Sequence, residues 1–122
     1  MRSLKFRAWD GKKMIDDVIP ASETSIIELF EYEWQETEVK AVEQYTGLND
    51  KNGKEIYECD IVSERHGDII GKIVQKPSGE YRIAWLGIYG GDSSLYDHRS
   101  LCEVIGNIHE TPGLLVEIND VD

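Results

Sequence analysis

Apolar and polar residues alternate along most of the chain with the period of a β-strand. In residues 3–9, Leu4, Phe6 and Ala8 fall on one face and Lys5, Arg7 and Trp9 on the other, which predicts a strand with one core face. The turn signal Asp10-Gly11 follows it. Further strands are predicted over residues 12–19, 38–48, 54–62, 69–75, 81–86 and 101–108. The pattern therefore predicts about seven or eight short strands with close turns.

The stretch from 43 to 62 predicts a strand, a turn and a second strand. Asn52-Gly53 is a pair that favours a tight hairpin turn, so we expect a positive φ at Gly53. The returning strand is interrupted near Glu58-Cys59. Asp60 follows that interruption, and its carboxylate is placed to accept backbone N–H groups of the turn. We expect a structural role for both Gly53 and Asp60.

Residues 22–36 are ambiguous between helix, strand and loop. Ile26, Leu29 and Phe30 have helical spacing, and the adjacent pair Ile26-Ile27 interrupts strand alternation. The spacing favours a loop or a single helical turn, with a strand as the alternative. The same segment carries the densest run of glutamates in the chain, which is typical of a solvated face.

The predicted architecture is mainly β with little helix. A chain of 122 residues has the length of one domain, so we expect a single domain over 1–122. Short antiparallel strands at close intervals favour a small barrel or sandwich. The strand rhythm between 60 and 83 resembles that of an SH3-like barrel.

Charge narrows the classes of partner. The chain has 24 acidic and 13 basic residues, and its net charge is −11. Proteins that bind a nucleic-acid backbone carry a basic surface, so we expect no direct binding to nucleic acid. The excess acid is typical of a soluble protein, and the alternative is a mimic of DNA in which carboxylates imitate phosphates. No leader or membrane-spanning run is evident, so we expect a cytoplasmic protein that does not bind membranes.

No motif indicates catalysis, a cofactor or a metal. Gly90-Gly91 lacks the Lys-Ser/Thr of a phosphate-binding loop, and the three histidines have no chelating spacing. Cys59 and Cys102 lie in apolar contexts, which favours buried free thiols over nucleophiles. We expect no cofactor, no metal and no enzymatic activity.

The remaining polar and aromatic candidates surround the Gly90-Gly91 loop. Loops held by a rigid sheet often carry binding function. The candidate contact surface comprises Trp85, Tyr89, Tyr96, His98 and Arg99. Peripheral aromatic residues also predict self-association, most simply as a dimer. Its contact is expected on the apolar face of residues 28–38 or on the loop at 85–96.

Three motifs give the chain a resemblance to a known family. They are Lys5-Phe6-Arg7-Ala8-Trp9-Asp10 at the start, the run Gln44 to Val62 at the centre, and Val104-Ile105-Gly106-Asn107-Ile108 near the end. Together they resemble the YopX family of small phage and prophage proteins, from about residue 4 to 115. Two positions depart from its pattern: Cys59 stands where glycine is usual, and Gly113 where an acidic residue is common.

The resemblance implies a mainly β fold and a phage setting, which places the protein in the host cytoplasm, and it carries over no biochemical activity. The sequence therefore predicts a phage or prophage accessory protein that acts as a non-enzymatic protein-binding module. Its partner would be a host or phage protein. The alternative is an acidic DNA mimic that blocks a host DNA-binding enzyme.

Overall fold

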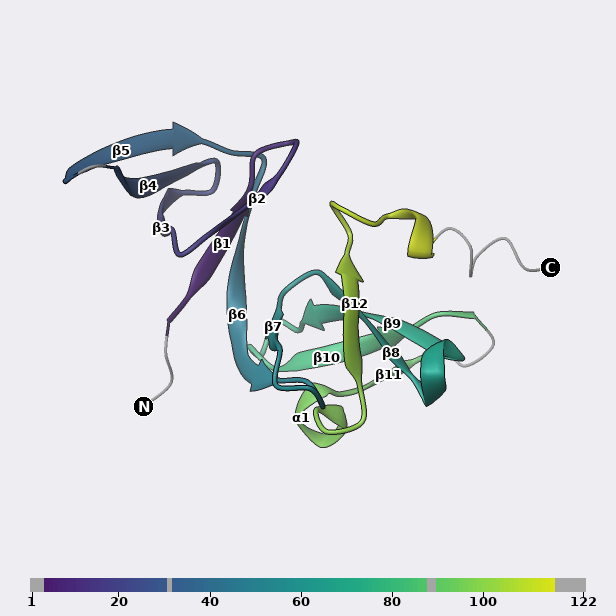
Figure 1. Cartoon of the computed structure of the whole chain (residues 1–122). Coiled ribbons are helices and arrows are strands. Elements are labelled where there is room, and N and C mark those ends of the chain that lie inside the picture. Colours follow the sequence, from purple (N-terminus) through teal and green to yellow (C-terminus); the bar gives the residue numbers. More distant parts are fainter. Residues whose placement is uncertain (1–3, 31, 88–89, 116–122) are drawn as a thin grey trace. The chain divides into compact units, whose positions relative to one another are not determined.

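A computed structural model describes residues 4–30, 32–87 and 90–115 of the chain (Figure 1). The fold is mainly β, with antiparallel strand pairing and little helix, as predicted. The elements are β1 (Phe6–Trp9), β2 (Met14–Asp16), β3 (Ile19–Ser22), β4 (Ser25–Phe30), β5 (Glu33–Glu38), β6 (Ala41–Asn49), β7 (Glu55–Tyr57), β8 (Asp60–Glu64), the 3-10 turn η1 (Arg65–Gly67), β9 (Ile69–Gln75), β10 (Tyr81–Trp85), β11 (Asp92–Ser94), α1 (Leu95–His98) and β12 (Glu103–Asn107).

The chain divides into two compact units, residues 1–45 and 46–122, and β6 runs through the boundary. Each unit has its own buried cluster. That of the first unit is formed by Ala8, Val18, Ile26 and Val39. That of the second is formed by Ile56, Val62, Ile73, Ile83, Leu95 and Cys102.

In the first unit, β1 pairs with β2 and β6, and β3, β4 and β5 form a three-stranded sheet in that order. The predicted hairpin after β1 is present, but the loop spans residues 10–13, and β2 is much shorter than the predicted return strand. Arg7 was assigned to a polar face, yet it is buried. Its Nε donates to Glu43 Oε1 at 2.9 Å, because the β1–β6 register places the two residues opposite one another.

For residues 22–36 the favoured interpretation, a loop or a helical turn, was wrong and the alternative of a strand is confirmed, because β3, β4 and β5 occupy this segment. The adjacent isoleucines have different surroundings. Ile26 is fully buried in the cluster of the first unit, whereas Ile27 is partly exposed on the opposite face of the sheet. Because apolar residues occupy both faces, the polar alternation of a strand is lost and a helical spacing arises by coincidence.

In the second unit, the sheet order is β11-β10-β9-β8-β12. The central turn lies between β6 and β7, and Gly53 has φ 84°. Asp50 is buried at this turn. Its Oδ1 accepts the N–H groups of Asn52 and Lys54, and its Oδ2 accepts that of Val104 at the start of β12. The side chain therefore connects the turn to a strand distant in sequence.

A sharp bend separates β7 from β8. Cys59 has φ 66° there, so this position does adopt the left-handed conformation that suits the glycine usual in the resembling family. Asp60 Oδ2 accepts the Tyr57 N–H at 2.8 Å and spans the bend. Both cysteines are free, but only Cys102 is buried, so the expectation of burial was wrong for Cys59.

Candidate functional site

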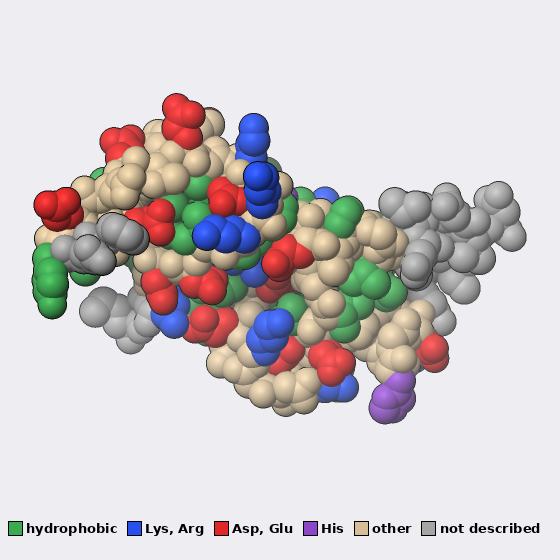
Figure 2. Space-filling model, turned by 45° about the horizontal axis from the view of Figure 1, so that its top comes forward, with side chains coloured by type: hydrophobic (Ala, Val, Ile, Leu, Met, Phe, Trp, Pro, Cys, Tyr) green, Lys and Arg blue, Asp and Glu red, His purple; other side chains and the backbone are tan. Residues whose placement is uncertain are grey.

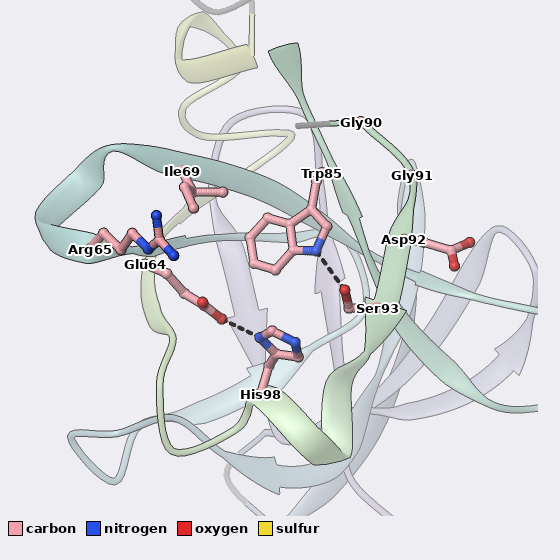
Figure 3. A pocket seen from close by; sticks show the side chains of 9 residues that line it. All are labelled: Glu64, Arg65, Ile69, Trp85, Gly90, Gly91, Asp92, Ser93 and His98. Atoms are coloured by element: carbon pink, nitrogen blue, oxygen red, sulfur yellow. Dashed lines mark hydrogen bonds and ion pairs between the residues drawn. The ribbon is translucent and has the colours of Figure 1, made fainter. Parts of the chain in front are cut away.

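An open pocket of about 340 Å³ lies in the second unit, where the sequence predicted a contact surface. Two of the predicted residues, Trp85 at the end of β10 and His98 at the end of α1, line it (Figure 3). The remaining lining residues are Glu64, Arg65, Ile69, Gly90, Gly91, Asp92 and Ser93. A volume of this size is at the lower end of small-molecule sites.

At the centre of the pocket, three contacts join four side chains in a row. His98 Nδ1 lies 2.6 Å from Glu64 Oε2, and the His98 ring meets the indole of Trp85 edge-on, with centroids 5.6 Å apart. Trp85 Nε1 donates to Ser93 Oγ at 2.9 Å. In Figure 3 the imidazole lies beneath the indole, with Glu64 on one side and Ser93 on the other.

Gly71 on β9 makes room for this arrangement. It stands opposite Trp85 in the β9–β10 pairing. A Cβ at Gly71 would lie 2.9 Å from Trp85 Cε3 and 2.5 Å from Ile83 Cγ2, closer than real atoms approach. The missing side chain of Gly71 therefore leaves room for the Trp85 ring at the edge of the pocket.

The acidic wall of the pocket is already neutralised. Lys76 Nζ and Arg82 Nε each lie 2.9 Å from a carboxylate oxygen of Asp92, and these hydrogen bonds, that of Lys76 first, lower the pKa of Asp92. Since Glu64, Trp85 and His98 are likewise paired with one another or with Ser93, the polar groups of the pocket mainly hold its own strands together.

The other predicted contact residues do not line the pocket. Tyr96 is 59% exposed, and the Arg99 guanidinium stacks on its ring, 3.9 Å from the centroid. Tyr89 lies outside the described residues. Sequence reasoning missed Glu64, which is far from His98 in the chain and reaches it only through the fold. Within the described ranges, no cluster of three or more metal-binding side chains occurs.

A second surface lies on the three-stranded sheet of the first unit. Strand register places Ile19 opposite Ile27, and Leu29 opposite Trp34, on the face that points away from the buried Ile26. Ile19, Leu29 and Trp34 are 50%, 61% and 64% exposed. We call these four residues, Ile19, Ile27, Leu29 and Trp34, the apolar face. Tyr32, in the turn between β4 and β5, is 99% exposed.

Carboxylates border the apolar face along β5. Glu36 stands opposite Ile27, and Glu38 opposite Ser25. Glu36 Oε1 accepts the Ser25 hydroxyl at 2.9 Å, which holds one carboxylate at the boundary. Acidic side chains are spread over much of the molecular surface seen in Figure 2, consistent with the net charge of −11. The surface thus combines an exposed aromatic centre with an acidic border.

Comparisons with known proteins agree with this fold. The crystal structure of protein EF1440 from Enterococcus faecalis is similar to the chain, with 28% sequence identity and a TM-score of 0.62. The alignment covers 94% of this chain and 99% of that protein. A search of curated proteins gave no match. None of the helices in the described ranges has the length and apolar character needed to span a bilayer.

The family comparison covers both units. The sequence matches the YopX protein family over residues 5–116, which include the three motifs quoted above. A match over nearly the whole chain shows that this protein belongs to the YopX family.

Proposed function

We propose that this chain is a non-enzymatic protein-binding module, an accessory protein of phage or prophage, that contacts its partner through the apolar face. The observation that carries the proposal is the exposure of Leu29 and Trp34 as a cross-strand pair, at 61% and 64%. Monomeric proteins rarely leave contiguous apolar side chains in water without a role in binding. Tryptophan surrounded by less critical contacts is a common centre of binding energy.

The pocket supports this role less well than the apolar face does. Its Glu64, Trp85 and His98 already satisfy one another or a neighbouring strand, so a ligand would have to compete with these contacts. Leu29 and Trp34, in contrast, expose most of their side-chain surface to water, so a partner would not have to displace a hydrogen bond to cover them. Their burial against a partner would release water from apolar surface, which is the dominant favourable term in association.

Charge indicates the kind of partner. Glu36 and Glu38 border the apolar face, and the whole chain carries a net charge of −11. A partner with a basic rim around an apolar centre would meet complementary potential, which speeds encounter and rejects acidic competitors. A second copy of this chain would bring carboxylates against carboxylates. We therefore favour a different, basic protein over self-pairing at this face.

The test compares captures from a bacterial host lysate. The full chain, a Leu29→Ser/Trp34→Ala variant and a Tyr96→Ala variant are immobilised in parallel. Tyr96 is the matched control, because its ring is also exposed but lies in the second unit. We expect a basic protein that is retained by the wild type and by Tyr96→Ala and is lost from the double variant. The circular dichroism spectra of the three proteins should be the same, which would show that the double variant is folded.

Identical captures by all three proteins would refute the proposal. If the specifically captured protein binds DNA, competition with duplex DNA distinguishes the two readings of the acidic surface. Release of the captured protein by DNA would favour the mimic, in which carboxylates occupy the site of phosphates. Retention in the presence of DNA would favour a contact that depends on the apolar face.

A further inference from the structure

The outer edge of β5 offers backbone groups as well as side chains. β5 is the last strand of the β3-β4-β5 sheet, and no other strand pairs with its outer edge in the described part of the chain. Its six residues pair with β4 in one uninterrupted register. In an antiparallel pair, alternate residues direct N–H and C=O groups away from the partner. β5 therefore presents a regular row of donors and acceptors.

The two edges of this sheet are protected differently. β3 contains Pro20, which has no N–H, and its register shifts between Pro20 and Ser22, both of which discourage pairing. β5 has neither device. Instead it carries Glu33, Glu36 and Glu38, all exposed. Charge repels only a strand of like sign, so β5 excludes acidic strands, including β5 of a second copy, but not basic ones.

We propose, resting on the function proposed above, that the basic partner adds an extended segment as a strand along β5. The register defines its pattern. Trp34, Glu36 and Glu38 alternate along the side of β5 that bears the apolar face. The added strand would therefore place an apolar residue beside Trp34 and Lys or Arg beside Glu36 and Glu38, at alternate positions. Backbone hydrogen bonds would provide affinity, and these side chains specificity.

Synthetic peptides test this mode directly. The probes are Ac-Thr-Lys-Thr-Lys-Thr-Val-Thr-amide, which suits antiparallel addition, and the peptide with the reversed order, which suits parallel addition. Each is titrated into the full ¹⁵N-labelled chain while amide chemical shifts are recorded. We expect the shifts of residues 33–38 to change, together with slower hydrogen exchange at the amides of the outer edge.

Backbone methylation is the decisive control. N-methyl groups at alternate residues on the peptide edge that faces β5 remove the ladder donors, whereas methyl groups on the other edge do not. We expect the first peptide to bind at least about tenfold more weakly, because it loses several backbone hydrogen bonds at once. Equal binding by both methylated peptides would overturn strand addition. Chemical-shift changes confined to residues outside β5 and its neighbouring strands would also overturn it, as would the absence of shift changes with either unmethylated peptide.

Reversing the charge of Glu36 and Glu38 tests whether these carboxylates select a basic peptide. In a Glu36→Lys/Glu38→Lys variant, the lysine peptides should lose affinity and peptides with glutamate in place of lysine should gain it. Unchanged preference would overturn the specificity assigned to these carboxylates. The two proposals fail separately. In one outcome, the captured protein is lost with Leu29→Ser/Trp34→Ala while both methylated peptides bind equally well. That combination would support binding through the apolar face and reject strand addition.

Discussion

Removing the Asp50 carboxylate should destabilise the second unit more than any other single change at the central turn. Asp50 is 6% exposed and accepts three backbone N–H groups, those of Asn52, Lys54 and Val104, at 2.8–2.9 Å. In Asp50→Ala, all three donors lose a charged acceptor. The donor of Val104 is also one of the links between the turn and β12.

The magnitude follows from these contacts. A hydrogen bond to a charged group is worth about 1.5–3 kcal/mol. Asn52 and Lys54 are exposed, so water can replace much of what their N–H groups lose, whereas Val104 is only partly accessible. Counting the Val104 bond in full and the two turn bonds in part gives roughly 3–5 kcal/mol. This is a large fraction of the roughly 5–15 kcal/mol that stabilises a typical protein.

Urea denaturation followed by circular dichroism measures this loss, with Asp10→Ala as the matched control. Asp10 Oδ1 also accepts two backbone N–H groups of its turn, from Lys12 and Lys13, but in an exposed loop. Water should replace those bonds with little loss, even though they lower the pKa of Asp10. Equal shifts of the denaturation midpoint in the two variants would refute the reasoning, because they would show that burial and the link to Val104 contribute nothing.

Three further predictions concern single positions, and a fourth concerns self-association. Gly53→Val should lower the free energy of unfolding by about 1–3 kcal/mol, measured in urea, purely through its φ of 84°, since an added Cβ meets nothing within 4 Å. Gly71→Ala should displace Trp85 and cost about 1–3 kcal/mol from overpacking; unchanged tryptophan fluorescence would contradict this. Burial raises the pKa of the Cys102 thiol from 9.0 to about 11, so the unfolded thiol ionises first and stability should fall as pH rises through that range; Cys102→Ala should weaken this dependence, and an identical profile would argue against it. Dimerisation stays a prediction, and light scattering across a tenfold dilution tests it: because carboxylates oppose self-pairing at the apolar face, a dimer that dissociates in Trp85→Ala but not in Trp34→Ala supports a contact at the loop of residues 85–96, and the mass of one chain at every concentration refutes dimerisation.

Much of the fold could be predicted from local sequence patterns of apolar residues and turn residues. The strand at Ile69–Gln75 was predicted with its observed bounds, and the interruption near Cys59 separates β7 from β8. Turn residues bound Ile69–Gln75 on both sides and β-branched residues fill it, so its assignment as a strand did not depend on a strict alternation. The strands between 19 and 38 escaped because apolar residues occupy both faces. The outer set is the same apolar face on which the proposed function rests, so the local rule failed where exposed apolar residues are proposed to contact a partner and do not fill the core.

The candidate site was less accessible from sequence. Trp85 and His98 were predicted as part of a contact surface because they lie near a glycine-rich loop, and both line the pocket beside that loop. Their contact with a partner stays a prediction. Their partner Glu64 requires knowledge that the end of β8 lies close to α1, which no local pattern conveys. Asp50 is similar: its turn was predicted, but its bond to Val104 depends on pairing across more than fifty positions of sequence. Long-range partners of polar groups emerge only with topology.

The buried pair of Arg7 and Glu43 bears on how the chain avoids misfolding. A slip of β1 by one residue against β6 would turn Arg7 to the other side of the sheet and leave the Glu43 carboxylate without its guanidinium. Breaking a buried ion pair in this way costs about 3–5 kcal/mol. An offset pairing of β1 with β6 would therefore be less stable than the native register. The ion pair therefore favours the native β1–β6 register over offset registers that apolar contacts alone would tolerate.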